Sequence, residues 1–305
     1  MPTAIPLKRF VLFAATCLLM TFPETTHGAK WSRVLEKEDV VIIYEESMEP
    51  AAEETAGIYP AIRTSLEAVF QWRLDFRPTI YLVRRNKEFQ RMAATDIIVA
   101  FALPSKKLIV IDYSRMKTDP FSIEVTLKHE LCHLLLHEHI PEENLPFWLD
   151  EGLAQWMSGG ISELITPSKR SLLKEATLAG RYVTLQDLKK RYAAGRDSLL
   201  LAYEASKSLV EFIIRKHGSE RLLEALRYLE TGHSLEEALK KGLSISQEDL
   251  EKAWHEDLRR RTTWINFLIS NMYEILFFLA ALIVSYGFLR ALIKKRAYMS
   301  GMEDE

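Results

Sequence analysis

The sequence predicts an α+β fold, in which a small mixed sheet and a helix rich in histidine come first and a helical lobe follows. Three observations favour this class. Short β-branched runs lie before residue 115, apolar residues recur at helical spacing after residue 145, and a helix with two histidines four residues apart lies between these regions. A long apolar stretch near the carboxyl end predicts a C-terminal transmembrane helix in addition.

The predicted sheet begins with short β-branched runs, which are typical of strands. A segment with helical periodicity, residues 51–72, follows the first run, and Pro60 interrupts it because proline lacks the N–H that a helix interior needs. The predicted strands are residues 40–44, 79–83 and 108–113. The order strand, helix, strand, strand therefore precedes the next helix.

Both ends of that next helix can be predicted. Asp119 is the expected N-cap and Pro120 the first helical residue, while Pro141 ends the helix because the residue before a proline disfavours the helical conformation. Apolar residues at helical spacing form one face: Ile123, Leu127, Leu131, Leu134 and Leu135. Histidine and glutamate residues gather on another face of the same helix.

On that second face, residues 129–133 read His-Glu-Leu-Cys-His, which is the pattern H-E-x-x-H. Residues four apart lie on one side of a helix, so His129 and His133 can bind a single zinc ion. Glu130 then lies near the open coordination position, where it can take a proton from zinc-bound water. The alternative is a surface helix that carries two histidines by chance, and the sequence that follows argues against it.

A zinc site of this kind needs a third protein ligand, and two residues compete for the position. Glu151 lies in a short predicted helix that begins near Pro146 and ends at Gly159. His139 stands where the pattern H-E-x-x-H-x-x-G-x-x-H has its last ligand, but that pattern needs a glycine to break the helix. Leu136 occupies the glycine position and continues the helix, which directs His139 away. We therefore favour Glu151.

The two segments His-Glu-Leu-Cys-His and Pro-Phe-Trp-Leu-Asp-Glu-Gly-Leu-Ala-Gln-Trp together resemble the gluzincin metallopeptidases, specifically the peptidase MA-like domains found in many bacterial proteins. The resemblance covers about residues 40–260, and only these two segments are specific. It implies a zincin-like fold and one zinc ion per chain, with His129, His133 and Glu151 as ligands and Glu130 as general base and acid. Seventeen residues separate His133 from Glu151, one fewer than in the aminopeptidase members of that clan, and the difference falls in the connecting loop.

The resemblance also suggests roles for an aspartate and a tyrosine. Asp150 is expected to orient a ligand histidine, or simply to favour the start of its helix. Related enzymes use a tyrosine or histidine from a later helix to stabilise the oxyanion, and Tyr203 matches that position best. Tyr192 and Tyr182 are possible substitutes, and a tyrosine at such a place can also be an ordinary core residue.

In zincin-like folds a peptide substrate pairs with an edge strand beside the metal through main-chain hydrogen bonds. Residues 98–104 or 108–112 are candidates for that edge, and the sequence does not decide between them. After residue 160 the chain is predicted to be helical and to close one wall of the cleft. The predicted helices are residues 185–192, 199–216, 220–229 and 248–261, and Ser234 with Glu237 has the form of a capping box.

The amino-terminal sequence predicts export. Lys8 and Arg9 precede the mostly apolar run 10–22, and small and polar residues follow up to Ala29. This is the form of a secretory signal peptide over residues 1–29, with processing near Gly28 or Ala29. Without processing, the segment would act as a membrane anchor instead.

The carboxyl-terminal sequence predicts a single membrane anchor. Residues 273–293 are apolar over about the length of a bilayer-spanning helix, and Lys294 directly follows them with two further cations, which favours a cytoplasmic tail. The predicted organisation is a signal peptide at 1–29, a peptidase domain at 30–262, an anchor at 263–293 and a cytoplasmic tail at 294–305. Within the domain, the sheet-bearing lobe covers about 30–140 and the helical lobe about 141–262.

Composition restricts the possible partners. A net charge of −2, with no basic stripe that aromatic residues interrupt, gives no indication of nucleic-acid binding. Of the two cysteines, Cys17 is expected to leave with the signal peptide, so Cys132 remains alone and no intrachain disulfide can form. Cys132 is expected to pack behind the metal-site helix as a small apolar residue.

These observations predict a membrane-anchored zinc metallopeptidase that acts on peptides or proteins outside the cytoplasm. Its localisation would be a single-pass cell-membrane protein with a periplasmic or extracytoplasmic domain. No acidic sequence that would bind a substrate's free amine is evident, which favours endopeptidase activity. Two alternatives remain open: a non-catalytic binding protein with a zincin fold, and a zinc hydrolase that acts on a non-peptide amide or ester.

Overall fold

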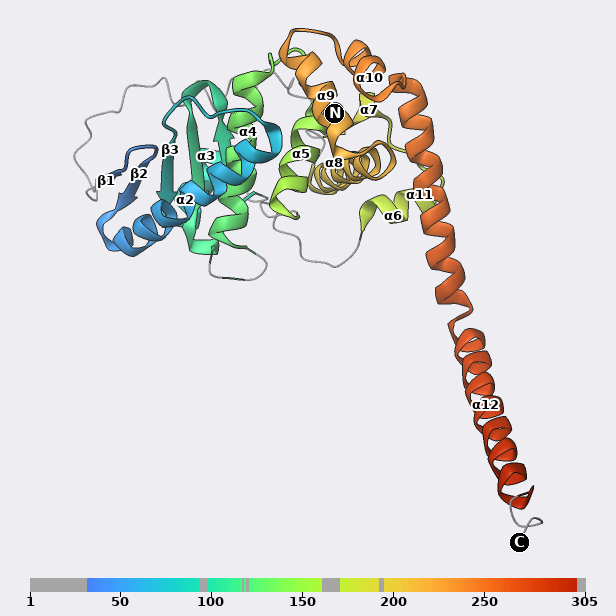
Figure 1. Cartoon of the computed structure of the whole chain (residues 1–305). Coiled ribbons are helices and arrows are strands. Elements are labelled where there is room, and N and C mark those ends of the chain that lie inside the picture. Colours follow the sequence, from blue (N-terminus) through green and yellow to red (C-terminus); the bar gives the residue numbers. More distant parts are fainter. Residues whose placement is uncertain are drawn as a thin grey trace. The chain divides into compact units, whose positions relative to one another are not determined.

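The computed structural model describes residues 32–93, 98–116, 118, 121–160, 171–191 and 195–300, without the side chains of 189–191, 263–270, 289 and 292–300 (Figure 1). The chain divides into two compact units, Met1–Trp254 and His255–Glu305. The predicted signal peptide, the predicted helix start at Asp119 and Pro120, and the alternative tyrosine Tyr192 all lie outside the described residues.

The first unit contains a mixed five-stranded sheet with the order β1-β2-β3-β5-β4. Its strands are β1 (Ser32–Glu36), β2 (Val41–Glu45), β3 (Thr79–Val83), β4 (Ala100–Leu103) and β5 (Leu108–Asp112). Strands β2, β3 and β5 are parallel, and β1 and β4 pair antiparallel with their neighbours. The edge strands are β1 and β4. Because β5 lies between β3 and β4, the edge candidate of the two that the sequence left open is β4 and not residues 108–112.

The strands form where the sequence predicts buried β-branched residues. In β3, Ile80 and Leu82 are buried while their neighbours Thr79 and Tyr81 are only partly so, which is the alternation of a strand with one apolar face. In β5, the residues from Ile109 to Asp112 are all buried, as expected of an interior strand that is covered on both faces. The three predicted strands are thus confirmed to within one residue at either end.

Two long helices lie side by side against the sheet. They are α2 (Glu49–Phe70), which contacts β2, and α4 (Ile123–His139), which contacts β4, and the two helices pack on each other (Figure 1). Pro60 lies within α2 without ending it, and its side chain is exposed. The short elements of this part of the chain are α3 (Asn86–Ala93) and the 3-10 turns η1 (Glu46–Met48), η2 (Pro104–Lys106) and η3 (Tyr113–Arg115), of which η3 follows the last strand.

The rest of the chain that the structure describes is helical, as predicted. The helices are α5 (Phe147–Ser158), α6 (Leu172–Leu178), α7 (Leu185–Arg191), α8 (Arg196–His217), α9 (Ser219–Glu230), α10 (Leu235–Leu243), α11 (Gln247–Ser270) and α12 (Met272–Ser300). Helix α8 is central, because α5, α6, α7 and α9 all pack on it. The predicted capping box is confirmed at the start of α10, where Ser234 and Glu237 cap each other's backbone N–H groups.

Helices α5 and α8 pack unusually closely at Gly152. A Cβ atom at this position would lie 2.5 Å from both the carbonyl oxygen of Ser206 and Cγ2 of Val210. One of these contacts is backbone, so it cannot move aside cheaply. The lack of a side chain at Gly152 therefore allows α5, the helix that carries Glu151, to pack close to α8.

We expect Gly152→Ala to destabilise the protein by about 1–3 kcal/mol, because the added methyl forces α5 away from α8. Urea unfolding of the purified protein measures this free energy. Gly57→Ala is the matched control: Gly57 lies inside α2, a methyl group added there would meet no neighbouring atom within 4 Å, and alanine favours helices by about 1 kcal/mol over glycine. Equal stability of the two variants would contradict the close packing at Gly152.

In the second unit, α12 presents apolar side chains to solvent. Phe277, Ile283 and Val284 are each 71% exposed. Judged over the described residues alone, none of the helices combines the length and the apolar character that a membrane crossing requires. The transmembrane helix expected from the sequence is therefore not confirmed.

Candidate metal centre

Helix α4 carries the pattern H-E-x-x-H in its buried middle. The helix begins at Ile123, with Ser122 as the extended N-cap residue, and it ends where Ile140 turns to an extended conformation before Pro141. The end is as predicted, whereas the helix starts later than the expected cap at residue 119. His129 and Glu130 are almost completely buried, so the polar face of α4 points into the protein and not to solvent.

Helix α5 supplies the third residue. Pro146 is its extended N-cap residue, and Gly159, with a φ of 81°, ends it in the left-handed conformation that glycine adopts without strain. Both limits agree with the sequence prediction. Glu151 lies in the second turn of this helix and is 5% exposed.

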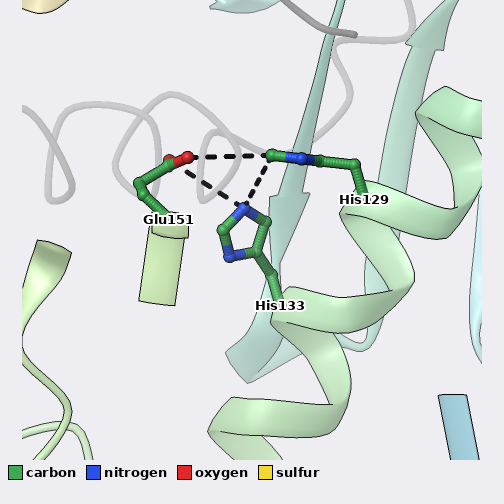
Figure 2. Close-up of side chains that lie close together, drawn as sticks. All are labelled: His129, His133 and Glu151. Carbon is green, nitrogen blue, oxygen red and sulfur yellow. Dashed lines mark hydrogen bonds and ion pairs between the residues drawn. The ribbon is translucent and has the colours of Figure 1, made fainter. Parts of the chain in front are cut away.

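The three expected ligands converge (Figure 2). Nε2 of His129 and Nε2 of His133 are 3.1 Å apart. The Glu151 carboxylate lies 3.7 Å from the first nitrogen and 3.9 Å from the second. All three side chains offer a ligand atom within 4.8 Å of the others. Two helices thus bring together two imidazoles and one carboxylate.

This donor set fits a zinc ion. Two ligand atoms bound to a tetrahedral zinc at 2.0–2.1 Å are about 3.3 Å apart, and the observed separations of 3.1, 3.7 and 3.9 Å lie around that value. Two histidines and one glutamate are also the ligands of one class of catalytic zinc site, in which the fourth position is open. His129, His133 and Glu151 would hold the metal.

Asp150 orients one of the imidazoles. Its Oδ1 lies 2.7 Å from Nδ1 of His133, and its Oδ2 lies 3.1 Å from Nε2 of His137. Nδ1 of His133 therefore donates to a carboxylate, and Nε2 is left facing the other ligands. This contact confirms the orienting position expected for Asp150. His137, which the sequence placed only near the helix end, is a second partner of the same carboxylate.

The pKa shifts in this cluster reflect mutual stabilisation of opposite charges. Burial alone would lower the pKa of His133, but Asp150, Glu151 and Glu130 outweigh it and raise that pKa well above its ordinary value. Burial alone would raise the pKa of Asp150, but His133 and His137 outweigh it and lower that pKa. Asp150 therefore remains ionised, which strengthens the hydrogen bond that orients His133.

We expect Asp150→Asn to weaken zinc binding by about 10- to 100-fold, because the amide keeps the shape of the carboxylate but loses its charge. Competition with a chromophoric chelator measures the zinc Kd. Asp249→Asn, at an exposed helix start where Ser246 is the partner, should leave the Kd unchanged. An unchanged Kd in Asp150→Asn would show that Asp150 serves only the start of α5.

His139, the rival third ligand, does not join the cluster. It is six residues after His133, which places it about 120° around the helix axis at 3.6 residues per turn. Its Nε2 lies 2.8 Å from the carbonyl oxygen of Arg73, and its Nδ1 lies 3.2 Å from Oε1 of Glu230. Because Leu136 continues the helix, His139 points to another part of the protein.

The two residues expected to act on the substrate have different surroundings. Glu130 is 1% exposed and close enough to His133 to raise its pKa. Tyr203, on α8, is 2% exposed, packs with Leu199 and Leu200, and has its ring 6.2 Å from that of Phe147 on α5. Its catalytic role stays a prediction. Tyr182, a possible substitute, is 41% exposed.

Cys132 lies on α4 between the two ligand histidines in sequence but is completely buried and forms no disulfide. Burial, followed by the nearby Asp150 charge, raises the pKa of its thiol. Cys132 is therefore a neutral, small apolar side chain behind the metal centre, as the sequence predicts.

Comparisons with known proteins give one family match. A model of the peptidase MA superfamily matches residues 95–260, more than half of the 305-residue chain. This segment contains both α4 and α5 and all three residues of the metal cluster. A search of curated proteins gives no significant match.

Among solved structures, the chain is similar to an M1 zinc metallopeptidase from Deinococcus radiodurans, with 14% identity and a TM-score of 0.40 over 74% of this chain and 51% of that chain. A mutant of the same metallopeptidase gives 16% identity and a TM-score of 0.41 over 73% and 51%. The mutant bound to a Tyr-Ser-Ala substrate gives 15% identity and a TM-score of 0.39 over 73% and 51%. The chain spans about half the length of these solved structures.

Proposed function

The chain belongs to the peptidase MA superfamily, and from this membership we propose that it is a zinc-dependent metallopeptidase that hydrolyses peptide bonds. The observation that carries the proposal is the convergence of His129, His133 and Glu151 beside Glu130. A site that only stored zinc would have no need of a buried carboxylate that is not a ligand. Such a carboxylate is what general acid–base chemistry requires.

Each residue has a separate task in this proposal. When bound by His129, His133 and Glu151, zinc would act as a Lewis acid that polarises the peptide carbonyl and makes water more acidic. Glu130 takes a proton from the attacking water as the new C–O bond forms, and it delivers that proton to the nitrogen as the C–N bond breaks. Asp150 keeps His133 oriented, and we propose that the Tyr203 hydroxyl donates a hydrogen bond to the oxyanion.

The proposal is tested with the purified full chain in detergent. We expect it to contain zinc, to cleave members of a mixed peptide library, and to lose cleavage when a chelator removes the metal. Added zinc should restore the activity. Zinc without any cleavage would instead support the non-catalytic binding protein, and products from amide or ester compounds alone would support the non-peptide hydrolase.

We further propose that cleavage is internal to the substrate chain. The support is the absence, in the sequence, of an acidic segment that would bind a free amino terminus. Peptides blocked at both ends should therefore be cleaved as fast as their unblocked forms. Strong dependence of the rate on a free amino terminus would overturn this part of the proposal.

The site of action is also a proposal: a single-pass membrane protein with its catalytic domain outside the cytoplasm. The apolar sequence 273–293 and the exposed apolar side chains of α12 support it, because a bilayer would cover such surface. The full chain should float with liposomes, and the double variant Phe277→Lys with Ile283→Lys should float less. Protease added to spheroplasts, from which any outer membrane barrier has been removed, should digest the catalytic domain. Equal flotation, or full protection from the protease, would contradict this location.

A further inference from the structure

His139, the last residue of α4, belongs to a compact cluster on the side of that helix away from the metal ligands. Its ring stacks on the indole of Trp72, with centroids 4.8 Å apart and planes 3° from parallel. Its two nitrogens face the Arg73 carbonyl oxygen at 2.8 Å and Oε1 of Glu230 at 3.2 Å. The side chains of His139 and Glu230 are 19% and 35% exposed, so the contact between them is only partly open to water.

Glu230, the last residue of α9, contacts the side chains of both His139 and Trp72 through its carboxylate oxygens. While Oε1 faces His139, Oε2 accepts a hydrogen bond from Nε1 of Trp72 at 2.9 Å. A second contact between the same two segments lies beside it, where Arg227 donates to the side chain of Gln71. The helical lobe is therefore joined, through α9, to the loop between α2 and β3 and to the end of α4.

The cluster surrounds one imidazole ring with a stacked indole and two acceptor oxygens. The two His139 nitrogens face the Arg73 carbonyl oxygen and the Glu230 carboxylate, both of which accept hydrogen bonds. Parallel stacking on Trp72 adds contact over the whole face of the imidazole ring. Because a hydrogen bond to a carboxylate is stronger than one between neutral groups, the cluster fixes the end of α4 more firmly than apolar packing alone.

The position of the cluster connects it with the metal centre. Helix α4 carries two of the ligands and α5 the third, and the two helices already meet through Asp150. His139 lies about 9 Å further along α4 than His133, at 1.5 Å rise per residue. From Glu230 the packing continues through α9 and α8 to α5. The ligand helices also pack directly on each other, and the route through α9 and α8 adds a separate restraint on the end of α4.

We propose that Trp72, His139 and Glu230 form a clamp that positions the zinc-binding helix. The clamp fixes the direction of α4 relative to α5, and so it holds the two imidazole nitrogens at 3.7 and 3.9 Å from the Glu151 carboxylate, where one ion can bind all three groups. These three side chains do not touch the substrate, so they are positioning residues. The inference rests on the proposed function in so far as it takes the zinc site as the structure that is positioned.

The test compares Glu230→Ala with Glu230→Gln in the full chain. Alanine removes the acceptor of both rings, whereas glutamine keeps an acceptor for Trp72 and loses only the charge that faces His139. We expect the zinc Kd to rise by about tenfold in Glu230→Ala and by less in Glu230→Gln. We also expect kcat to fall with little change in KM, because the substrate-binding surfaces stay in place. Cobalt substituted for zinc should show an altered visible spectrum in Glu230→Ala.

Ser208→Ala is the matched control. Ser208 on α8 accepts a hydrogen bond from the indole of Trp254 at 3.2 Å, so this variant also removes the side-chain acceptor of a tryptophan. It should lower Tm by a comparable amount and leave the zinc Kd and the cobalt spectrum unchanged. Should Glu230→Ala fail to fold, the same measurements on Glu230→Gln and His139→Gln decide the matter.

A wild-type zinc Kd in Glu230→Ala, or an equal rise in Ser208→Ala, would overturn the clamp and leave the proposed peptidase intact. Conversely, a wild-type protein that binds zinc and cleaves no peptide would overturn the proposed function alone. In that case the zinc Kd and the cobalt spectrum still decide on the clamp, since neither depends on turnover.

Discussion

Replacing Glu130 by glutamine is expected to lower kcat for peptide hydrolysis by about 10²- to 10⁴-fold while the zinc content stays at the wild-type level. The amide is nearly the same size as the carboxylate, so the buried site around it should keep its packing. It cannot accept a proton at neutral pH, however, and so it can neither activate water nor protonate the departing amine. Single-turnover cleavage of a fluorogenic peptide, with metal analysis of the same sample, measures both quantities.

Glu124→Gln provides the control for this prediction, because Glu124 is an exposed glutamate in the first turn of the same helix. It should have wild-type activity and zinc content. Hydrolysis by Glu130→Gln at the wild-type rate would show that another group moves the proton. Loss of zinc from Glu130→Gln would show that Glu130 supports the metal site and would leave its acid–base role unproved.

Replacing His133 by alanine is expected to remove both zinc and activity. His133 supplies one of three ligand atoms and is also the residue that Asp150 orients. Changes to residues that only orient a ligand cost about 10- to 100-fold in metal affinity, so loss of the ligand itself should cost more than about 100-fold. The zinc Kd from chelator competition is the measurement, and circular dichroism verifies that the variant is folded.

His233→Ala is the matching control, because His233 contacts Thr231 and Lys241 at the start of α10 and has no contact with the metal cluster among the described residues. It should bind zinc like the wild type. A folded His133→Ala protein with wild-type zinc affinity would mean that the metal lies elsewhere.

Much of the metal centre could be predicted because its signals are local. The spacing of His129 and His133 on one helix, the stop at Pro141, and the Gly159 end of α5 each depend on a few neighbouring residues, and all agree with the structure. His139 could also be rejected as a ligand from one local feature, because Leu136 stands where a glycine would be needed to end the helix. Helix limits and the spacing of residues on one helix follow from local backbone preferences, so they can be predicted without knowledge of tertiary packing.

Other features depend on contacts between distant residues and could not be predicted. The edge position of β4 depends on pairing with β5 and not on its own sequence. Strand β1 has no clear pattern in its sequence, because Val34 is 54% exposed and the strand lacks the alternation of buried apolar residues that marks the others. The contacts of Glu230 span 91 residues to His139 and 158 to Trp72, and no local pattern announces them.

The predicted interruption at Pro60 was wrong. Pro60 was expected to interrupt its helix, but α2 continues through it for a further ten residues. Packing of buried residues on both sides of the proline, including Tyr59 and Ile62, outweighs the lost hydrogen bond. Tertiary packing therefore decides whether a helix survives a weak position within it.

The most direct test of the account is the metal content of Glu151→Ala beside that of the wild type, both purified as full chains without added metal and measured by mass spectrometry of the elements. The account predicts one zinc per wild-type chain and much less than one per variant chain, because the Glu151 carboxylate is the third ligand that α5 brings beside Nε2 of both imidazoles. Equal zinc in the two proteins would contradict it.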